Sequence, residues 1–214
     1  MSALLRNYGP MLAKAIAVHT AYVLAATACG LLLGLLLGIL LSRVPRWSSL
    51  LLPLLSVLQT IPGLVFIGVL FILWGSSAAV VVAALSIYAM FPVLKNTYAG
   101  ILSVERRYIE AAKGCGMSPL QALVQVELPL AAPAIAAGVR MSAVYTVSWT
   151  VLAAMIGRGG LGDFVYQGVA SNNQSLILLG AVPSALLAVA FGAAIDMVQR
   201  RLTPHGLRKK EAVE

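Results

Sequence analysis

The sequence predicts an all-α membrane protein with about five transmembrane helices. Of its 214 residues, 60% are hydrophobic and only 10% are charged, and the mean hydropathy is +0.94. A soluble domain of this size needs more polar surface, so lipid must cover part of the chain. One span takes roughly 20 apolar residues. The apolar runs reach this length, and they fit a single transmembrane domain over residues 19–198, preceded by an N-terminal segment, 1–18, and followed by a basic tail, 199–214.

Five apolar runs are the expected spans. They cover about residues 19–41, 50–73, 78–94, 130–156 and 176–198. The first run is too long for a signal-peptide core and has no small-residue cleavage site, so we expect an uncleaved span. Its glycines recur every four residues on one helical face, where they would permit close helix packing: Gly30, Gly34 and Gly38.

Three spans contain residues that are unusual in a membrane. Pro62 removes a backbone donor from the second span, which should kink or break there, against protein or water. Arg140 is the one ionisable residue well inside a span, where exposure to hydrocarbon costs about 2.5 to 3.5 kcal/mol. It should face protein or water, or reach the cytoplasmic interface if the span starts later. Asp196 lies at helical pairing distance from Arg200.

The distribution of Lys and Arg predicts the orientation. Basic segments at residues 43–46, 95–113 and 199–214 alternate with nearly uncharged connections at Gly75 and 158–172. Short cytoplasmic loops carry the cationic excess, so loop 96–128 and the tail should be cytoplasmic and the N-terminus external, although Arg6 and Lys14 oppose the last point. The net charge of +8 fits cations beside anionic lipid, and no nucleic-acid-binding motif is present.

The polar segment from Asn96 to Glu127 should contain a helical hairpin. Val104 to Lys113 are good helix formers that Gly114 and Gly116 stop. Ser118 has the position of an N-cap, followed by Pro119 and by Gln121 at capping-box spacing. Its apolar residues need a partner protein, with contacts expected from Tyr108, Ile109, Ala112 and Leu120, and with Glu110 and Arg107 fixing the register by charge.

One pattern extends across the hairpin: Glu110-Ala111-Ala112, Gly116, Val126, Leu128 and Pro129. It resembles the coupling-helix signature of ATP-binding-cassette (ABC) importer permeases. The resemblance implies a type I importer permease fold in a bacterial inner membrane, a homodimer or a heterodimer with a second permease, and an extracytoplasmic solute-binding protein. It also implies cytoplasmic ATPase subunits that dock on Glu110 to Pro129 and bind ATP and Mg²⁺, with coupling through Glu110, Ala111, Ala112, Gly116, Leu128 and Pro129.

Further segments resemble permeases for quaternary ammonium osmoprotectants such as glycine betaine, choline and carnitine: Gln59–Pro62, Lys95–Ile101, Ile156–Gly162 and Leu202–Pro204. Val147–Thr150 departs from the small-residue run of that group. Tyr145 and Trp149 share a helical face, which can hold a quaternary ammonium by cation-π attraction or pack against neighbouring helices. The candidate translocation path is Gln59, Pro62, Arg140, Tyr145 and Trp149. Permeases for methionine or an organosulfonate, and a passive channel or scaffold, are the alternatives.

Enzyme chemistry is not expected on this chain. Gly157 to Gly162 satisfy G-x-G-x-x-G, but they follow a membrane helix and not the strand that a dinucleotide site needs, so we expect a tight external loop. A phosphate-binding G-x-x-x-x-G-K-[ST] motif is absent, which places ATP hydrolysis on another subunit and predicts no cofactor here. His19 and His205 should be interfacial, and no spacing suggests a metal site.

Overall fold

The computed structural model describes the backbone of residues 2–202 and the side chains of residues 8–201. Within that range every regular element is helical: α1 (Ser2–Arg43), α2 (Pro45–Thr60), α3 (Gly63–Trp74), α4 (Ala78–Leu102), α5 (Arg106–Gly114), α6 (Pro119–Ala122), the π-helical turn η1 (Leu123–Glu127), α7 (Leu128–Thr150), the 3₁₀ segment η2 (Val151–Ile156), α8 (Gly162–Ala170) and α9 (Gln174–Leu202). The all-α prediction is confirmed. Most of the predicted basic tail, with His205 and Thr203-Pro204, lies outside the described residues.

The described helices fit about five spans. Four continuous helical stretches are long and apolar enough to cross a membrane: Tyr8–Arg43, Ala78–Leu102, Pro119–Ile156 and Gln174–Arg201. The pair α2 and α3 would be the fifth, bent by 91° at its break. Helices extend beyond the predicted spans, since α1 is helical from Ser2 and α4 continues to Leu102. Hydropathy reports contact with lipid, whereas helical hydrogen bonding continues into water.

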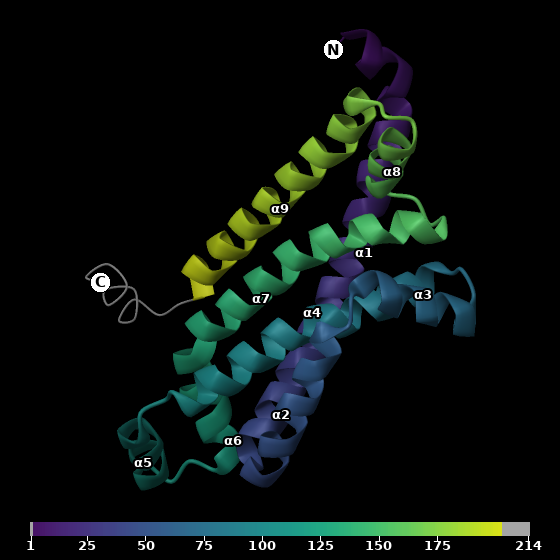
Figure 1. Cartoon of the computed structure of the whole chain (residues 1–214). Helices are drawn as coiled ribbons and strands as arrows, with labels where there is room; N and C mark the ends of the chain where they lie inside the picture. Colours follow the sequence, from purple (N-terminus) through teal and green to yellow (C-terminus); the bar gives the residue numbers. More distant parts are fainter. Residues whose placement is uncertain (1, 203–214) are drawn as a thin grey trace.

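The bundle is built around α1, α4 and α7, which cross one another, with α9 against α7 (Figure 1). The predicted glycine face of α1 is the contact with α4. A Cβ atom added to Gly30, Gly34 or Gly38 would lie only 2.6–2.7 Å from the Cβ atoms of Ala89, Val93 and Thr97 respectively. These glycines therefore permit the close approach expected for small residues between membrane helices.

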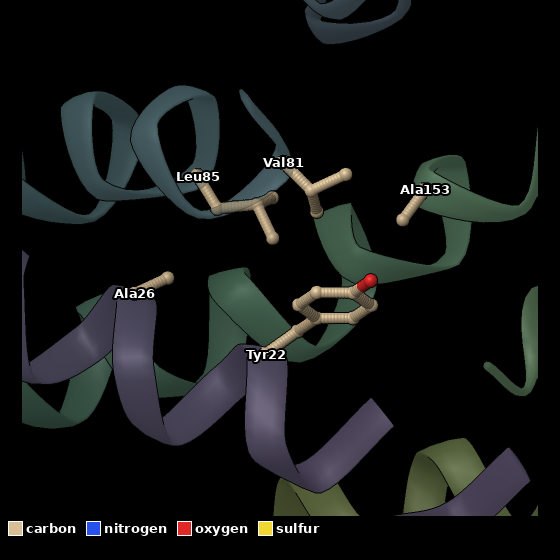
Figure 2. Close-up of a cluster of buried hydrophobic side chains, with 5 residues drawn as sticks. All are labelled: Tyr22, Ala26, Val81, Leu85 and Ala153. Atoms are coloured by element: carbon tan, nitrogen blue, oxygen red, sulfur yellow. The ribbon is translucent and has the colours of Figure 1, made fainter. Parts of the chain in front are cut away.

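A second contact region joins α1, α4 and η2. Tyr22 and Ala26 of α1, Val81 and Leu85 of α4, and Ala153 of η2 form a buried cluster (Figure 2). The Tyr22 hydroxyl extends beyond this cluster and donates a hydrogen bond to the backbone oxygen of Arg158, at 3.3 Å. The loop after η2 is thereby attached to α1.

The hairpin and α8 lie at opposite ends of the bundle (Figure 1). Helices α5 and α6 extend beyond the lower ends of α4 and α7, while α8 packs beside the N-terminal part of α1 and against α9. Residues 158–172, predicted as a connection between spans, contain the helix α8. Gly162 and Gly168 weaken the helical signal there, and burial of Phe164 against Ala15 and Leu176 compensates for their low propensity.

Candidate functional site

The hairpin has the predicted caps at both sides of its turn. Gly116 adopts φ +75° and ends α5 in a Schellman motif, in which its N–H donates to Lys113 O and the Met117 N–H donates to Ala112 O. The Ser118 side chain accepts from the Gln121 N–H while the Gln121 side chain accepts from the Ser118 N–H. This reciprocal capping box fixes the angle at which α6 leaves the turn.

The hairpin surface differs in part from the predicted contact set. Tyr108 and Leu120 are exposed, at 41% and 69%, and Ala111 is exposed as well. Ala112, by contrast, is only 3% exposed, so it packs inside the hairpin and offers no contact area. Its small side chain supports the turn.

Charged residues of the hairpin pair with one another along its surface. Glu110 pairs with Arg106 at 2.9 Å, and Arg107 pairs with Glu105 at 2.8 Å. The Glu105 carboxylate raises the pKa of Arg107 above its ordinary value. All four side chains are largely exposed, so these pairs contribute little stability and remain available to a partner.

The hairpin joins the bundle through η1. Leu128 and Pro129 follow this π-helical turn directly, and the missing N–H of Pro129 removes one helical bond where the helix is already widened. One continuous helical stretch, Pro119–Ile156, contains α6, η1, α7 and η2. The span expected over about residues 130–156 therefore continues directly from the hairpin. Because no loop separates α6 from α7, a displacement of the hairpin would act directly on α7.

A buried ion pair at η1 was missed by sequence reasoning. Glu127 accepts a hydrogen bond from Arg43, the last residue of α1, with Nη2 and Oε2 at 2.6 Å. The Glu127 side chain is only 4% exposed and that of Arg43 is 43% exposed. The partners are 84 residues apart, and nothing in the local sequence indicates their contact.

The second span is broken at Pro62 and not merely kinked. Ile61 is extended, with ψ 125°, as expected before a proline, and Pro62 has ψ 129°. The Ile61 oxygen accepts a hydrogen bond from the Tyr88 hydroxyl at 2.7 Å, and Gln59 Nε2 donates to the Tyr88 backbone oxygen at 3.3 Å. Helix α4 thus supplies partners for the break, as membrane depth requires.

Three rings surround this break and form an aromatic cluster of Phe66, Tyr88 and Trp149. Trp149 stacks on Tyr88 at a centroid distance of 4.5 Å, and Phe66 meets Tyr88 edge-on at 5.3 Å. A Cβ atom added to Gly63 would lie 1.5 Å from the Trp149 ring, so the glycine makes room for the indole. Gln59, Pro62 and Trp149 of the candidate path therefore come together.

The other two path candidates lie apart from this cluster. Tyr145 is half exposed and Trp149 packs on α4, so their shared helical face is not a shared pocket. Arg140 pairs with Asp196 of α9 at 3.2 Å, with side chains 56% and 37% exposed. Asp196 therefore has an interhelical partner that its helical spacing from Arg200 did not indicate.

His19, expected near the membrane interface, is buried between helices of the bundle. It is fully buried, and its Nε2 donates to the Val147 backbone oxygen at 3.1 Å. Because α1 begins well before residue 19, this histidine lies inside the helix and inside the bundle. It joins α1 to α7.

Comparisons with known proteins agree over nearly the whole chain. Residues 30–205 match the family described as "Binding-protein-dependent transport system inner membrane component". Two permease proteins of the glycine betaine/carnitine/choline transport system of Bacillus subtilis are similar: OpuCB is 34% identical over 100% of this chain and 98% of its own, and OpuCD is 39% identical over 80% and 74%. The fold resembles that of the inward-facing MetNI methionine ABC transporter, with TM-score 0.80, 21% identity and coverage of 91% and 99%.

Proposed function

Because the chain belongs to the family of binding-protein-dependent transport system inner membrane components, we propose that it translocates a quaternary ammonium osmoprotectant such as glycine betaine, choline or carnitine. It is an integral membrane transport subunit of an ABC importer and not an enzyme. The observation that carries the choice of solute is the similarity to osmoprotectant permeases across the full length of this chain. The MetNI neighbour supports only the fold, because it is 21% identical.

The hairpin is the proposed docking element for cytoplasmic ATPase subunits, which would bind ATP and Mg²⁺. Exposed Tyr108, Ala111 and Leu120 supply apolar contact area, and Glu110 supplies charge at the same surface. Gly116 sets the angle between α5 and α6. Leu128 and Pro129 connect the docked hairpin to α7, so displacement of the hairpin would reach the membrane helices.

The chain would act together with a second permease, either a copy or a similar chain. Two relatives carry the name of one B. subtilis transport system, which supports a heterodimer there. Helix α3 ends in four consecutive exposed apolar residues, Phe71, Ile72, Leu73 and Trp74, which lipid or a second permease can cover. An extracytoplasmic binding protein would deliver the solute.

The proposed translocation path passes the break between α2 and α3. Trp149 is partly exposed where it stacks on the buried Tyr88, and its indole can attract a quaternary ammonium group by cation-π interaction. Gln59 contributes a polar amide beside them, and Pro62 keeps the span open at this depth. Tyr145 and Arg140 precede Trp149 in α7, on the side toward the hairpin, and would contact the solute only outside this cluster.

Uptake in a strain that lacks its other osmoprotectant importers tests the proposed solute. Cells that express this permease with its ATPase and binding protein should take up radiolabelled glycine betaine or choline at high salt, and Trp149→Ala should reduce this uptake without reducing copurification of the ATPase. If the cells take up methionine or an organosulfonate and no quaternary ammonium compound, the proposed solute is wrong. Uptake that persists with an ATPase unable to hydrolyse ATP would indicate a passive channel.

Cysteine labelling tests the orientation. Cys29 and Cys115 are free and exposed, so the hairpin already carries a reporter. With Cys29 replaced by Ser, an impermeant maleimide should label Cys115 only in inverted vesicles. In a cysteine-free background, Asp163→Cys in the α8 segment should be labelled only from outside. Labelling of both sites from the same side would overturn the proposed orientation.

A further inference from the structure

A pocket of about 480 Å³ lies between the N-terminal part of α1 and the glycine-rich loop before α8. The segments that line it, the N-terminal part of α1 and α8, lie at the end of the bundle opposite the hairpin (Figure 1). Its volume falls in the usual range for small-molecule sites, about 300–1,000 Å³. Its charged and amide side chains are Lys14, Arg158, Asp163 and Gln167.

The loop that forms one wall is held in a specific conformation. Gly157, Gly159 and Gly160 have φ values of 70°, 77° and 99°, which side chains rarely adopt. Arg158 lies between them, and its backbone is held from two directions: its N–H donates to Ala153 O at 3.2 Å, and its oxygen accepts from Tyr22 at 3.3 Å. The buried cluster in Figure 2 thereby positions the residue that carries the guanidinium.

The pocket brings together charges that do not pair. Neither Lys14 nor Arg158 nor Asp163 takes part in any ion pair among residues 8–201. Arg158 Nε is buried and has no hydrogen-bond partner within the same range, a situation that proteins normally avoid. Burial also raises the pKa of Asp163, because its carboxylate has lost water without gaining a counter-charge.

We propose that this pocket binds a small zwitterion, with the carboxylate of the ligand on Arg158 and Lys14 and its cationic group facing Asp163 and Phe164. A planar guanidinium binds a carboxylate through two parallel hydrogen bonds. The aspartate and the phenyl ring are the groups in the wall that favour a cation. The three charges sum to +1, so a ligand that is only cationic, such as choline, should bind poorly, whereas glycine betaine or carnitine satisfies both signs.

The inference rests on the proposed function only for the solute class. The pocket is distinct from the translocation path at the broken span, and it would hold a zwitterion at the outer end of the permease. Met11 and Val18 of α1 line its apolar side, which suits the methyl groups of a betaine.

Equilibrium binding to the permease–ATPase complex in lipid nanodiscs, without binding protein, tests the proposal. Radiolabelled glycine betaine should bind saturably, and labelled choline at least about tenfold more weakly. Arg158→Gln should weaken glycine betaine binding by about tenfold or more, because a charge-assisted bidentate contact is lost. Arg158→Lys should restore part of it, and Lys14→Gln should cause a smaller loss. Arg46→Gln, in α2 just beyond the other end of α1, is the matched control and should leave binding unchanged.

Three results would overturn the proposal: no saturable glycine betaine binding by a complex that transports, equal binding of choline and glycine betaine, or equal effects of Arg158→Gln and Arg46→Gln. If Arg158→Gln abolishes association with the binding protein while glycine betaine binding persists, the pocket is a protein docking site and the proposal is also wrong. Saturable binding by a complex that transports no quaternary ammonium compound would refute the proposed solute while leaving the pocket assignment intact.

Discussion

Removal of Arg43 should destabilise the permease more than removal of the charge on its partner. Arg43→Gln leaves the Glu127 carboxylate, 4% exposed, buried without a counter-charge. Glu127→Gln leaves Arg43, which is 43% exposed and can regain water, and the new amide oxygen can still accept its hydrogen bond. The asymmetry in exposure therefore predicts an asymmetry in free energy.

The magnitude follows from that exposure. Breaking a fully buried ion pair from one side costs about 3–5 kcal/mol, whereas exposed pairs contribute about 0–1 kcal/mol. Because solvent screens Arg43, we expect a loss of about 2–3 kcal/mol in unfolding free energy for Arg43→Gln and about 1 kcal/mol for Glu127→Gln. The double variant should lose only about 1 kcal/mol, since no uncompensated carboxylate remains.

Reversible unfolding of the purified permease in mixed micelles, or its melting temperature in detergent, measures these values. Arg106→Gln is the matched control. It breaks a pair of similar length, 2.9 Å, whose side chains are 90% and 63% exposed, and should change the unfolding free energy by less than about 0.5 kcal/mol. Equal losses for the two single variants, or additive losses in the double variant, would refute the reasoning.

Three further predictions concern glycine positions and pH. Gly116→Val should reduce ATPase copurification and transport, because a residue with a side chain adopts φ +75° only at a cost of about 1 kcal/mol or more. Gly114→Ala should preserve both, because a Cβ atom added there has no neighbouring atom within 4 Å. Equal effects of the two variants would contradict this. Gly34→Ala should lower the unfolding free energy by about 1–3 kcal/mol through overlap with α4, and Gly68→Ala, in open space, should not lower it; normal stability of Gly34→Ala would exclude close packing there. Burial raises the pKa of Asp163, so the folded protein favours the protonated carboxyl. The stability that this carboxyl contributes is present below its unfolded pKa and is lost as pH rises through its folded pKa. Asp163→Asn should therefore raise the melting temperature at neutral pH and not in acid, and a lower melting temperature at neutral pH would contradict this sign.

Local features of the chain were predictable because their causes are local. The break at Pro62 follows from a missing N–H and a restricted preceding residue, and the hairpin turn follows from Gly116 and from the Ser118 and Gln121 caps. The glycine face of α1 was also predictable, since a four-residue period places Gly30, Gly34 and Gly38 on one face of any helix.

The sequence could not indicate contacts between distant segments. Arg43 with Glu127, His19 with Val147, and Arg140 with Asp196 each join different helices, and their residues carry no local sign of a partner. Trp149 and Tyr145 share a helical face, but Trp149 stacks on Tyr88 while Tyr145 is half exposed. The sequence did not indicate this difference. Such pairs depend on which helices adjoin and on the rotation of each helix about its axis.

By itself, the sequence determined the membrane class, the number and approximate limits of the spans, the broken helix and the hairpin, because hydropathy, proline, glycine and capping residues act within one or two helical turns. Only the tertiary structure decided which charged and aromatic side chains meet, and that the glycine-rich loop closes a charged pocket against α1. The physical reason is that a helix fixes its own backbone bonds, whereas its side chains find partners only after the helices have packed.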